Sequence, residues 1–284
     1  GNSGFLGTVR VSGATSLEGA LNTTGAALFS STVTIVGAGT FKSNVSVSGT
    51  TKLLGTVTAT GNSGFLGTVR VSGATSLEAA LNVTGAALFS STVTVVGAGT
   101  FKSNVSVSGN SNLLGTVTVG GAVSLASTLS VGGASNFAST VTIGGAVSIA
   151  GALSVGGATN LLGTVTATGN SGFLGTVRVS GATSLEAALN VTGAALFSST
   201  VTVVGAGTFK SNVSVSGTTK LLGTVTATGN AGFLGTVRVS GATSLEAALN
   251  VTGAALFSST VTVVGAGTFK SNVSVSGNSN LLGT

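Results

Sequence analysis

Polar and apolar residues alternate along this chain, and the alternation is organised in units of twelve residues that each begin with Gly. The first three units are GNSGFLGTVRVS, GATSLEGALNTT and GAALFSSTVTIV, and Gly recurs at every twelfth position from Gly1 to Gly277. Position 5 of each unit is Phe, Leu or Ile, position 9 is Val or Leu, and position 11 is usually Val or Ile. A short and unbroken period predicts one structural unit stacked on copies of itself.

Every charged residue falls on an even position of the unit. Arg takes position 10, Glu takes position 6, and Lys takes position 6 or 4, as in Arg10, Glu18, Lys42 and Lys52. Apolar odd positions and polar even positions are typical of a β-strand with one buried face and one solvated face. Abundant Gly, Ser, Thr and Val also disfavour a helix. The sequence therefore predicts an all-β rod.

We interpret the Gly at position 1 as a corner, where the chain bends or needs a conformation closed to other residues. The corners of the first five units are Gly1, Gly13, Gly25, Gly37 and Gly49. With about nine or ten extended residues per unit, each straight side would span about 30 Å. The predicted core of these units holds Phe5, Leu17, Phe29, Phe41 and Leu53 at position 5, and Val9, Leu21, Val33, Val45 and Val57 at position 9.

A longer period overlies the short one. Five units form a super-repeat that covers residues 1–60, 61–120, 169–228 and 229–284, and these copies are nearly identical. Four divergent units without any charge occupy residues 121–168 and keep the twelve-residue phase. We expect one continuous repeat array over residues 1–284, as an excerpt of a longer chain whose anchor and tip domains lie outside it.

Three ways of stacking the units fit the pattern. A single chain can coil with one twelve-residue unit per turn, or it can form a wider solenoid with turns of eighteen, twenty-four or thirty-six residues. A 24-residue turn would place Glu18 over Lys42 as a surface salt bridge, with Arg10 as a further candidate for such pairs. The third arrangement is an intertwined homotrimeric β-helix, in which each chain gives one twelve-residue side per layer. We favour the trimer because small residues near position 1 and a large residue at position 5 suit a triangular core. The single-chain β-solenoid is the alternative.

The composition leaves little chemistry to carry a function. The chain has no His, Cys or Tyr, and its only acidic residues are four widely separated Glu. This excludes the usual catalytic triads and most metal sites, so we expect no enzyme activity, no cofactor and no metal. The formal net charge of +6 comes from scattered residues, so we expect no nucleic-acid partner. No apolar stretch is long enough for a transmembrane helix, so we expect no membrane insertion.

Two surface motifs recur at the outward positions. Asn-x-Ser/Thr occurs eight times, first at Asn22 and Asn44, and permits glycosylation, although alternation of Asn, Ser and Thr also produces the pattern. Thr-x-Thr pairs such as Thr56/Thr58 would bind ice if they formed a flat array. Arg10 and Asn22 take the same position in neighbouring units and would interrupt that array.

Runs such as GGATNLLGTVTATGNSGFLGTVRVSGATSL and GGAVSLASTLSVGGASNFASTVTIGGAVSIAGALSV resemble the repetitive shafts of viral fibre proteins from tailed phages and large algal viruses. The resemblance covers the whole chain. It implies a homotrimeric β-helix on the virion surface or in another extracellular setting, with identical chains and other fibre or virion proteins as partners. The implied function is a structural shaft that projects a distal attachment domain. The alternatives are a cell-surface β-solenoid stalk or adhesin, and an ice-binding β-solenoid.

Overall fold

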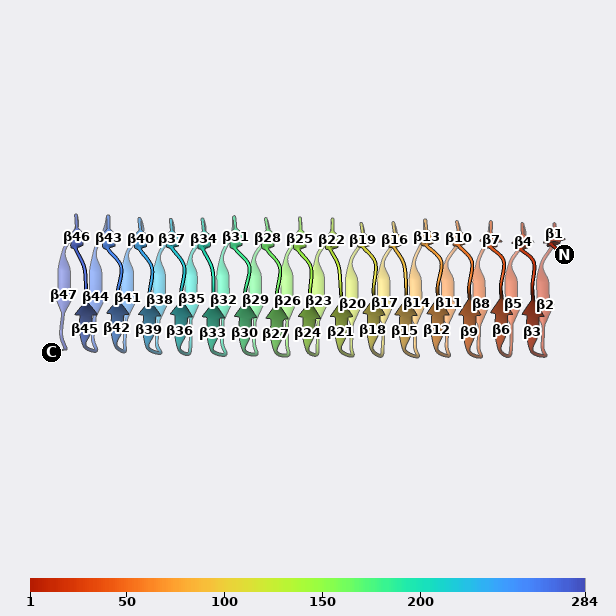
Figure 1. The fold of residues 1–284 in the computed structure, drawn as a ribbon, viewed down its shortest axis with the longest axis horizontal. Helices are drawn as coiled ribbons and strands as arrows, with labels where there is room; N and C mark the ends of the chain where they lie inside the picture. Colours follow the sequence, from red (N-terminus) through yellow and green to blue (C-terminus); the bar gives the residue numbers. More distant parts are fainter. Residues whose placement is uncertain (284) are drawn as a thin grey trace. The chain divides into compact units, whose positions relative to one another are not determined.

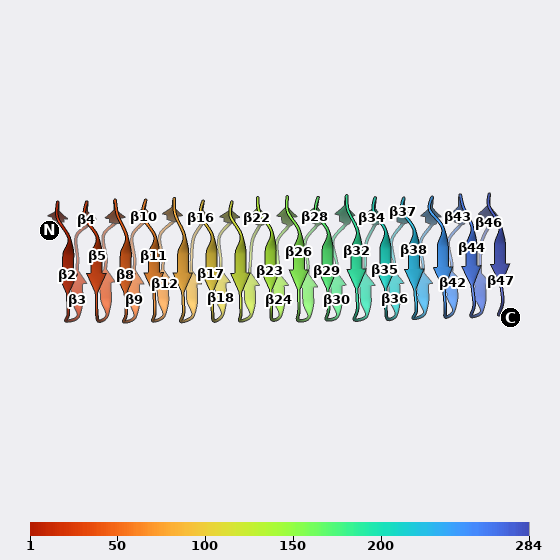
Figure 2. The ribbon, with the colours of Figure 1, turned by 180° about the vertical axis from the view of Figure 1, so that it is seen from behind.

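A computed structural model describes residues 1–283, which form short β-strands joined by tight corners. The strands pair in parallel and wind into a β-solenoid, which confirms the predicted all-β class. The chain divides into two compact units, Gly1–Gly144 and Gly145–Thr284, which we describe separately. Figures 1 and 2 show the strands of each unit from the front and from behind.

All strands have three residues and follow one rule. Each odd-numbered strand covers positions 3–5 of a twelve-residue unit and each even-numbered strand covers positions 9–11, from β1 (Ser3–Phe5) and β2 (Val9–Val11) to β47 (Ser279–Leu281). Corners therefore occur at both position 1 and position 7. The expectation of a single long straight side in each unit was wrong, because the small residue at position 7 is a second corner.

One turn of the solenoid spans 18 residues, which is also the separation between Asn44 and Asn62 in a hydrogen bond that joins successive turns. Each turn holds three strands. In the first unit, Ser3 of β1 pairs with Leu21 of β4 (Leu21–Thr23), and Leu21 pairs with Gly39 of β7 (Gly39–Phe41).

Every third strand belongs to the same sheet. In the first unit, β1 to β22 (Leu129–Val131), β2 to β23 (Ser135–Phe137) and β3 (Thr15–Leu17) to β24 (Val141–Ile143) form three sheets. Eight turns at a strand spacing of ~4.8 Å give this unit a length of about 38 Å.

The second unit repeats this architecture. It runs from β25 (Val147–Ile149) to β47, and Val147 pairs with Val165 of β28 (Val165–Ala167) in the same 18-residue register. The turn of 18 residues is one of the lengths considered from the sequence for a wider solenoid, and neither the 12-residue nor the 24-residue turn is formed. The intertwined homotrimer stays a prediction.

The sequence period and the longer solenoid turn are related by a simple alternation. A step of one turn moves position 5 of one unit onto position 11 of another, so Phe29 pairs with Val11 on one side and with Val47 on the other. Up each inner face, a large residue therefore alternates with a medium one. The same step moves position 1 onto position 7, so an invariant Gly alternates with Gly, Ser or Ala along each corner.

Close approach of successive turns explains the corner glycines. A Cβ atom added at Gly85 would lie 2.6 Å from the carbonyl carbon and oxygen of Gly67, one turn earlier. No glycine among the described residues has a positive φ, so the expected need for a special backbone conformation is not found there. The approach is equally close at glycines of position 7, such as Gly67, where an added Cβ would lie 2.5 Å from the carbonyl oxygen of Gly49.

The core holds aromatic rings only beside small residues. Each Phe at position 5 follows, two residues earlier on the same strand, an inward-facing Ser, Ala or Gly. At Gly39, an added Cβ would meet the Phe41 ring at 3.0 Å, so the ring fills the space over the small residue. The strand pattern small-x-Phe thereby keeps the volume of each inner face nearly constant.

Candidate functional site

The structure places the sequence-predicted core and corner residues as follows. Gly13, Gly25, Gly37 and Gly49 lie at corners between strands, and Gly1 precedes the first strand. Phe5 is 46% exposed and Leu17 is half-buried, because the first turn has a neighbouring turn on only one side. The other predicted core residues are buried, namely Val9, Leu21, Phe29, Val33, Phe41, Val45, Leu53 and Val57.

The predicted charged pairs are not brought together. Arg10 lies in the middle of β2, Glu18 follows β3, and Lys42 follows β7, so the three residues belong to three different sheets or corners. The 18-residue turn places Val36, and not Lys42, one turn above Glu18. The expected ladder of Glu18 over Lys42 is therefore wrong, because it required a 24-residue turn.

Two cations instead lie next to each other on a flat face. Lys52 of β9 (Thr51–Leu53) pairs with Arg70 of β12 (Val69–Val71), and Lys220 of β37 (Thr219–Leu221) pairs with Arg238 of β40 (Val237–Val239). Directly opposed like charges are unfavourable in a sheet. Sequence reasoning missed both pairs because neither 52 and 70 nor 220 and 238 differ by a multiple of twelve.

Asparagine side chains reinforce some corners. The Oδ1 atom of Asn44 accepts a hydrogen bond from the backbone N–H of Asn62 at 2.9 Å, and Asn62 Oδ1 accepts one from Ala80 N–H at 3.2 Å. Asn212 and Asn230 do the same in the second unit. The Asn44 sequon therefore coincides with a structural amide, whereas Asn22 lies in the middle of β4 with an exposed side chain.

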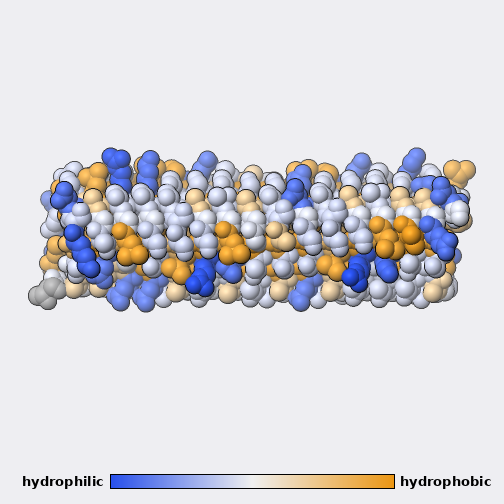
Figure 3. All heavy atoms as spheres, in the orientation of Figure 1, coloured by the Kyte–Doolittle hydropathy of each residue, from blue (hydrophilic) through white to orange (hydrophobic). Residues whose placement is uncertain are grey.

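The Thr-x-Thr pairs do not form a flat array of paired threonines. Thr58 lies on the face of β10 (Val57–Ala59), and Thr56 lies at the preceding corner. Thr58 pairs with Thr40 and Ser76 in the neighbouring turns, while the residues one turn from Thr56 are alanines. The surface in Figure 3 is accordingly pale and mixed, with charged and aliphatic side chains standing out singly.

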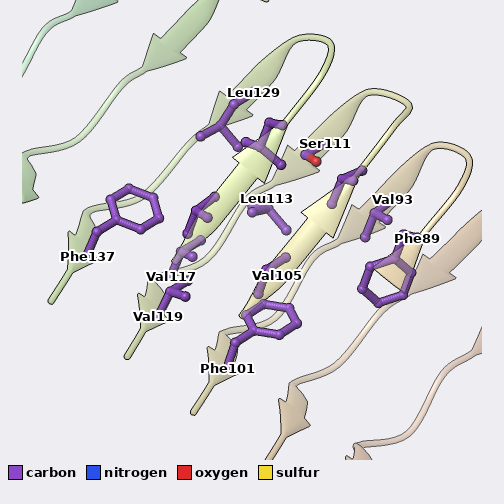
Figure 4. Close-up of a pocket in the computed structure, with 13 residues that line it drawn as sticks. Phe89, Val93, Phe101, Val105, Ser111, Leu113, Val117, Val119, Leu129 and Phe137 are labelled. Atoms are coloured by element: carbon purple, nitrogen blue, oxygen red, sulfur yellow. The ribbon is translucent and has the colours of Figure 1, made fainter. Parts of the chain in front are cut away.

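A cavity with a volume of about 30 Å³ lies inside the first unit. It is lined by Phe89, Phe101, Phe137 and aliphatic residues, with Ser111 as the one polar residue of its wall (Figure 4). It surrounds residues 111–128, a turn that has no Phe. A buried water needs two to four polar partners. This cavity is a packing void and not a binding site.

Several hydroxyls point into the core without a partner. Thr51 is 1% exposed and pairs with Val33 and Val69, and its Oγ1 has no hydrogen bond. Thr219 has the same environment in the second unit. Such hydroxyls cost stability because burial removes their water. They line no cavity that could bind a polar ligand with several contacts.

The described residues contain no cluster of three or more His, Cys, Asp or Glu side chains that would hold a metal ion. Nor does this part of the chain include a helix that is long and apolar enough to cross a bilayer. Comparisons with protein-family models, with curated proteins and with solved structures found no match. The fold defines the class of protein as a tandem-repeat parallel β-solenoid, built from three-residue strands in three sheets.

Proposed function

We propose that this chain is a shaft segment, a stiff β-solenoid spacer in an extended fibre that holds an attachment domain away from a virion. The observation that carries this proposal is the constant side length. Every strand in both units has three residues, and every corner has the same length, without one inserted loop. Binding and catalytic sites are usually built on loops of varied length. Because all corners of this chain are short and equal, the repeats set the cross-section and the length of the rod, which is what a spacer requires.

The hydrogen bonding of each unit suits a load-bearing element. Backbone bonds connect successive turns at the corners as well as in the strands, for example from Thr24 N–H to Phe5 O and from Lys42 N–H to Thr23 O, both at 2.9 Å. Within each unit, the interior strands have both edges paired, so the interior turns leave no open sheet edge. Elongation is then possible by adding twelve-residue units, without any change of the cross-section.

The resemblance to viral fibre shafts supports the virion setting, and it adds identical chains and other fibre proteins as proposed partners. A second candidate function is a cell-surface stalk whose faces themselves act as an adhesin. The stacked cations Lys52 and Arg70 favour this candidate, because an anionic ligand would relieve their repulsion. A pure spacer does not need such a pair.

The experiment is immunogold labelling in the organism that makes the protein, with an antibody raised against the repeat and electron cryotomography as the readout. A shaft predicts label along projections from particles, and an envelope-bound stalk predicts label on the cell surface. Label restricted to the cell interior overturns both candidates. Removal of residues 61–120 from the complete protein separates them. A spacer keeps attachment and shortens by about 16 Å at ~4.8 Å per turn, whereas a binding face loses part of its attachment.

A further inference from the structure

One corner of the first unit carries a row of exposed side chains, with a Lys on one side of its centre and a Glu on the other. The corner follows the strands of the sheet that begins with β1 and β4, and the residue directly after each strand is exposed. We call this row the corner stripe. From the N-terminal end it consists of Leu6, Thr24, Lys42, Thr60, Glu78, Val96 and Leu114.

The second unit carries the same stripe on one of its corners. There the residues follow the strands from β29 (Ser171–Phe173) to β47. They are Leu174, Thr192, Lys210, Thr228, Glu246, Val264 and Leu282, all exposed. In both units the stripe forms where one intact super-repeat follows another. The 60-residue super-repeat is three turns of 18 residues plus one side of six residues. In the first unit, Glu78 of the second copy therefore lies two turns after Lys42 of the first copy.

Backbone hydrogen bonds fix the spacing of the stripe. Lys42 N–H donates to Thr23 O at 2.9 Å, and Glu78 N–H donates to Ala59 O at 3.0 Å. At the centre, Thr60 Oγ1 donates to Lys42 O at 2.8 Å, and Thr228 makes the same bond to Lys210. The seven side chains therefore project from a rigid edge at intervals of ~4.8 Å.

We propose that the corner stripe is an antiparallel docking edge for a second copy of this chain. A two-fold axis through Thr60 places Lys42 opposite Glu78 of the second copy, and Glu78 opposite its Lys42. The same axis places Leu6 opposite Leu114, and Thr24 opposite Val96. Each contact occurs twice, which is the property of an isologous interface.

Charge complementarity selects the antiparallel direction. In a parallel pair, Lys42 would face Lys42 of the second copy and Glu78 would face Glu78, which is repulsive. The aliphatic ends suit contact in either direction, and they are well exposed, with Leu6 at 90% and Leu114 at 50%. Exposed aliphatic side chains beside a matched charge pair are typical of an interaction surface.

The neighbouring rows do not obstruct this contact. On the preceding face, the residues beside the centre of the stripe are the small polar Thr40, Thr58 and Ser76. On the following side, the corresponding residues are Asn44 and Asn62, whose Oδ1 atoms accept hydrogen bonds from the backbone N–H groups of Asn62 and Ala80, respectively. No charge or bulky side chain among these residues stands between the two edges.

The association through one stripe is expected to be weak. Exposed ion pairs contribute little individually, and a seven-residue edge buries less than a standard protein interface. This inference rests on the proposed shaft function. Antiparallel docking would join fibres that point toward each other. It would not join fibres that project side by side from one particle.

The test is sedimentation equilibrium of the 284-residue chain across a wide concentration range, with variants that change both stripes. An acidic variant carries Lys42→Glu and Lys210→Glu, and a basic variant carries Glu78→Lys and Glu246→Lys. Each alone places like charges opposite each other and should dimerise at least tenfold more weakly than the parent chain. An equimolar mixture should restore dimerisation, because every facing pair is then Glu against Lys.

The matched control carries Lys102→Glu and Lys270→Glu, which alter exposed lysines on corner rows that contain no Glu within the same unit. This control should dimerise like the parent, and circular dichroism should show the same β-structure in all variants. A parent chain that stays monomeric, or a mixture that does not recover, overturns the docking edge. A stable trimer that the variants do not change also overturns it. None of these results alters the immunogold test, which decides the shaft function separately.

Discussion

Phe29 of β5 (Ala27–Phe29) lies in register with Val47 of β8 (Val45–Val47), one turn later on the same sheet. Both side chains face the core and are nearly inaccessible, at 1% and 2% exposure. Because one turn is one and a half sequence units long, a large residue at position 5 always stacks on a residue at position 11. The twelve-residue period is therefore the smallest one that alternates large and medium residues on all three inner faces.

This relationship predicts which deletions the fold tolerates. Removal of residues 61–72 keeps the alternation, because the junction still joins position 5 to position 11. Removal of residues 61–78, which is one complete turn, would place Leu53 against Phe89 and Ser43 against Ala79. We expect the deletion of one sequence unit to retain the thermal midpoint of the parent and the deletion of one turn to lower it.

Differential scanning calorimetry provides the comparison, with circular dichroism to confirm β-structure. Equal midpoints for the two deletions, or a greater loss for the shorter one, would show that complete turns and not complete sequence units are what the fold requires.

The corner glycines predict a second effect. Gly85→Ala would place a Cβ 2.6 Å from the Gly67 carbonyl one turn below, so the turns must move apart. We expect a loss of about 1–3 kcal/mol in unfolding free energy, as for overpacked sites. Gly64→Ala is the matched control, because its Cβ would meet only Val45 O at 3.9 Å. Urea denaturation followed by circular dichroism measures both, and similar losses in the two variants would refute the close-approach explanation.

The buried hydroxyls predict a stabilising change. Thr51→Val removes an Oγ1 that has no hydrogen bond and keeps nearly the same side-chain shape between Val33 and Val69. We expect a gain of about 1–2 kcal/mol, the range for an unsatisfied buried polar group. Thr58→Val on the solvated face should change stability little. A neutral or negative result at Thr51, measured by urea denaturation, would mean that its hydroxyl has a partner in solution.

The core aromatic residues predict a large loss. Phe29→Ala removes a ring that is 1% exposed and leaves a cavity between Val11 and Val47. We expect a cost of about 3–5 kcal/mol. Leu28→Ala changes the adjacent, half-buried outward residue and should cost less than ~1 kcal/mol. Thermal unfolding of the two variants separates the inner face from the outer one, and equal losses would contradict the assignment of faces.

The sequence predicted the β-class and the two faces correctly, because period-two alternation depends only on local backbone geometry. It also identified Phe29, Val33 and Val45 as inward residues, all of which are buried. The predicted length of a side was wrong because about nine or ten residues of each unit were expected to be extended, which left no place for a corner at position 7. Position 7 accepts Ser and Ala between two glycines of adjacent turns, so its corner role was hidden by its variability.

The surface could not be read from the sequence without the turn length. Residues one turn apart become neighbours, and this step is not a multiple of the visible period. Lys52 therefore meets Arg70, a contact that does not follow from a twelve-residue repeat, and Lys42 shares a corner row with Glu78 because their separation of three sequence units is also two turns. The number of residues per turn is a property of how three faces close around the core, and it decides every lateral contact.

Cysteine cross-linking tests the 18-residue single-chain turn most directly, since the chain has no native Cys. Thr58 pairs with Ser76, so Thr58→Cys with Ser76→Cys places two cysteines on adjacent strands, within the range of a disulfide. Mild oxidation should give a disulfide within one chain, identified by peptide mass spectrometry. Thr58→Cys with Asn82→Cys, which would be neighbours only in a 24-residue turn, should give none. A disulfide in this second pair, or chains linked to each other by Thr58→Cys alone, would contradict the account.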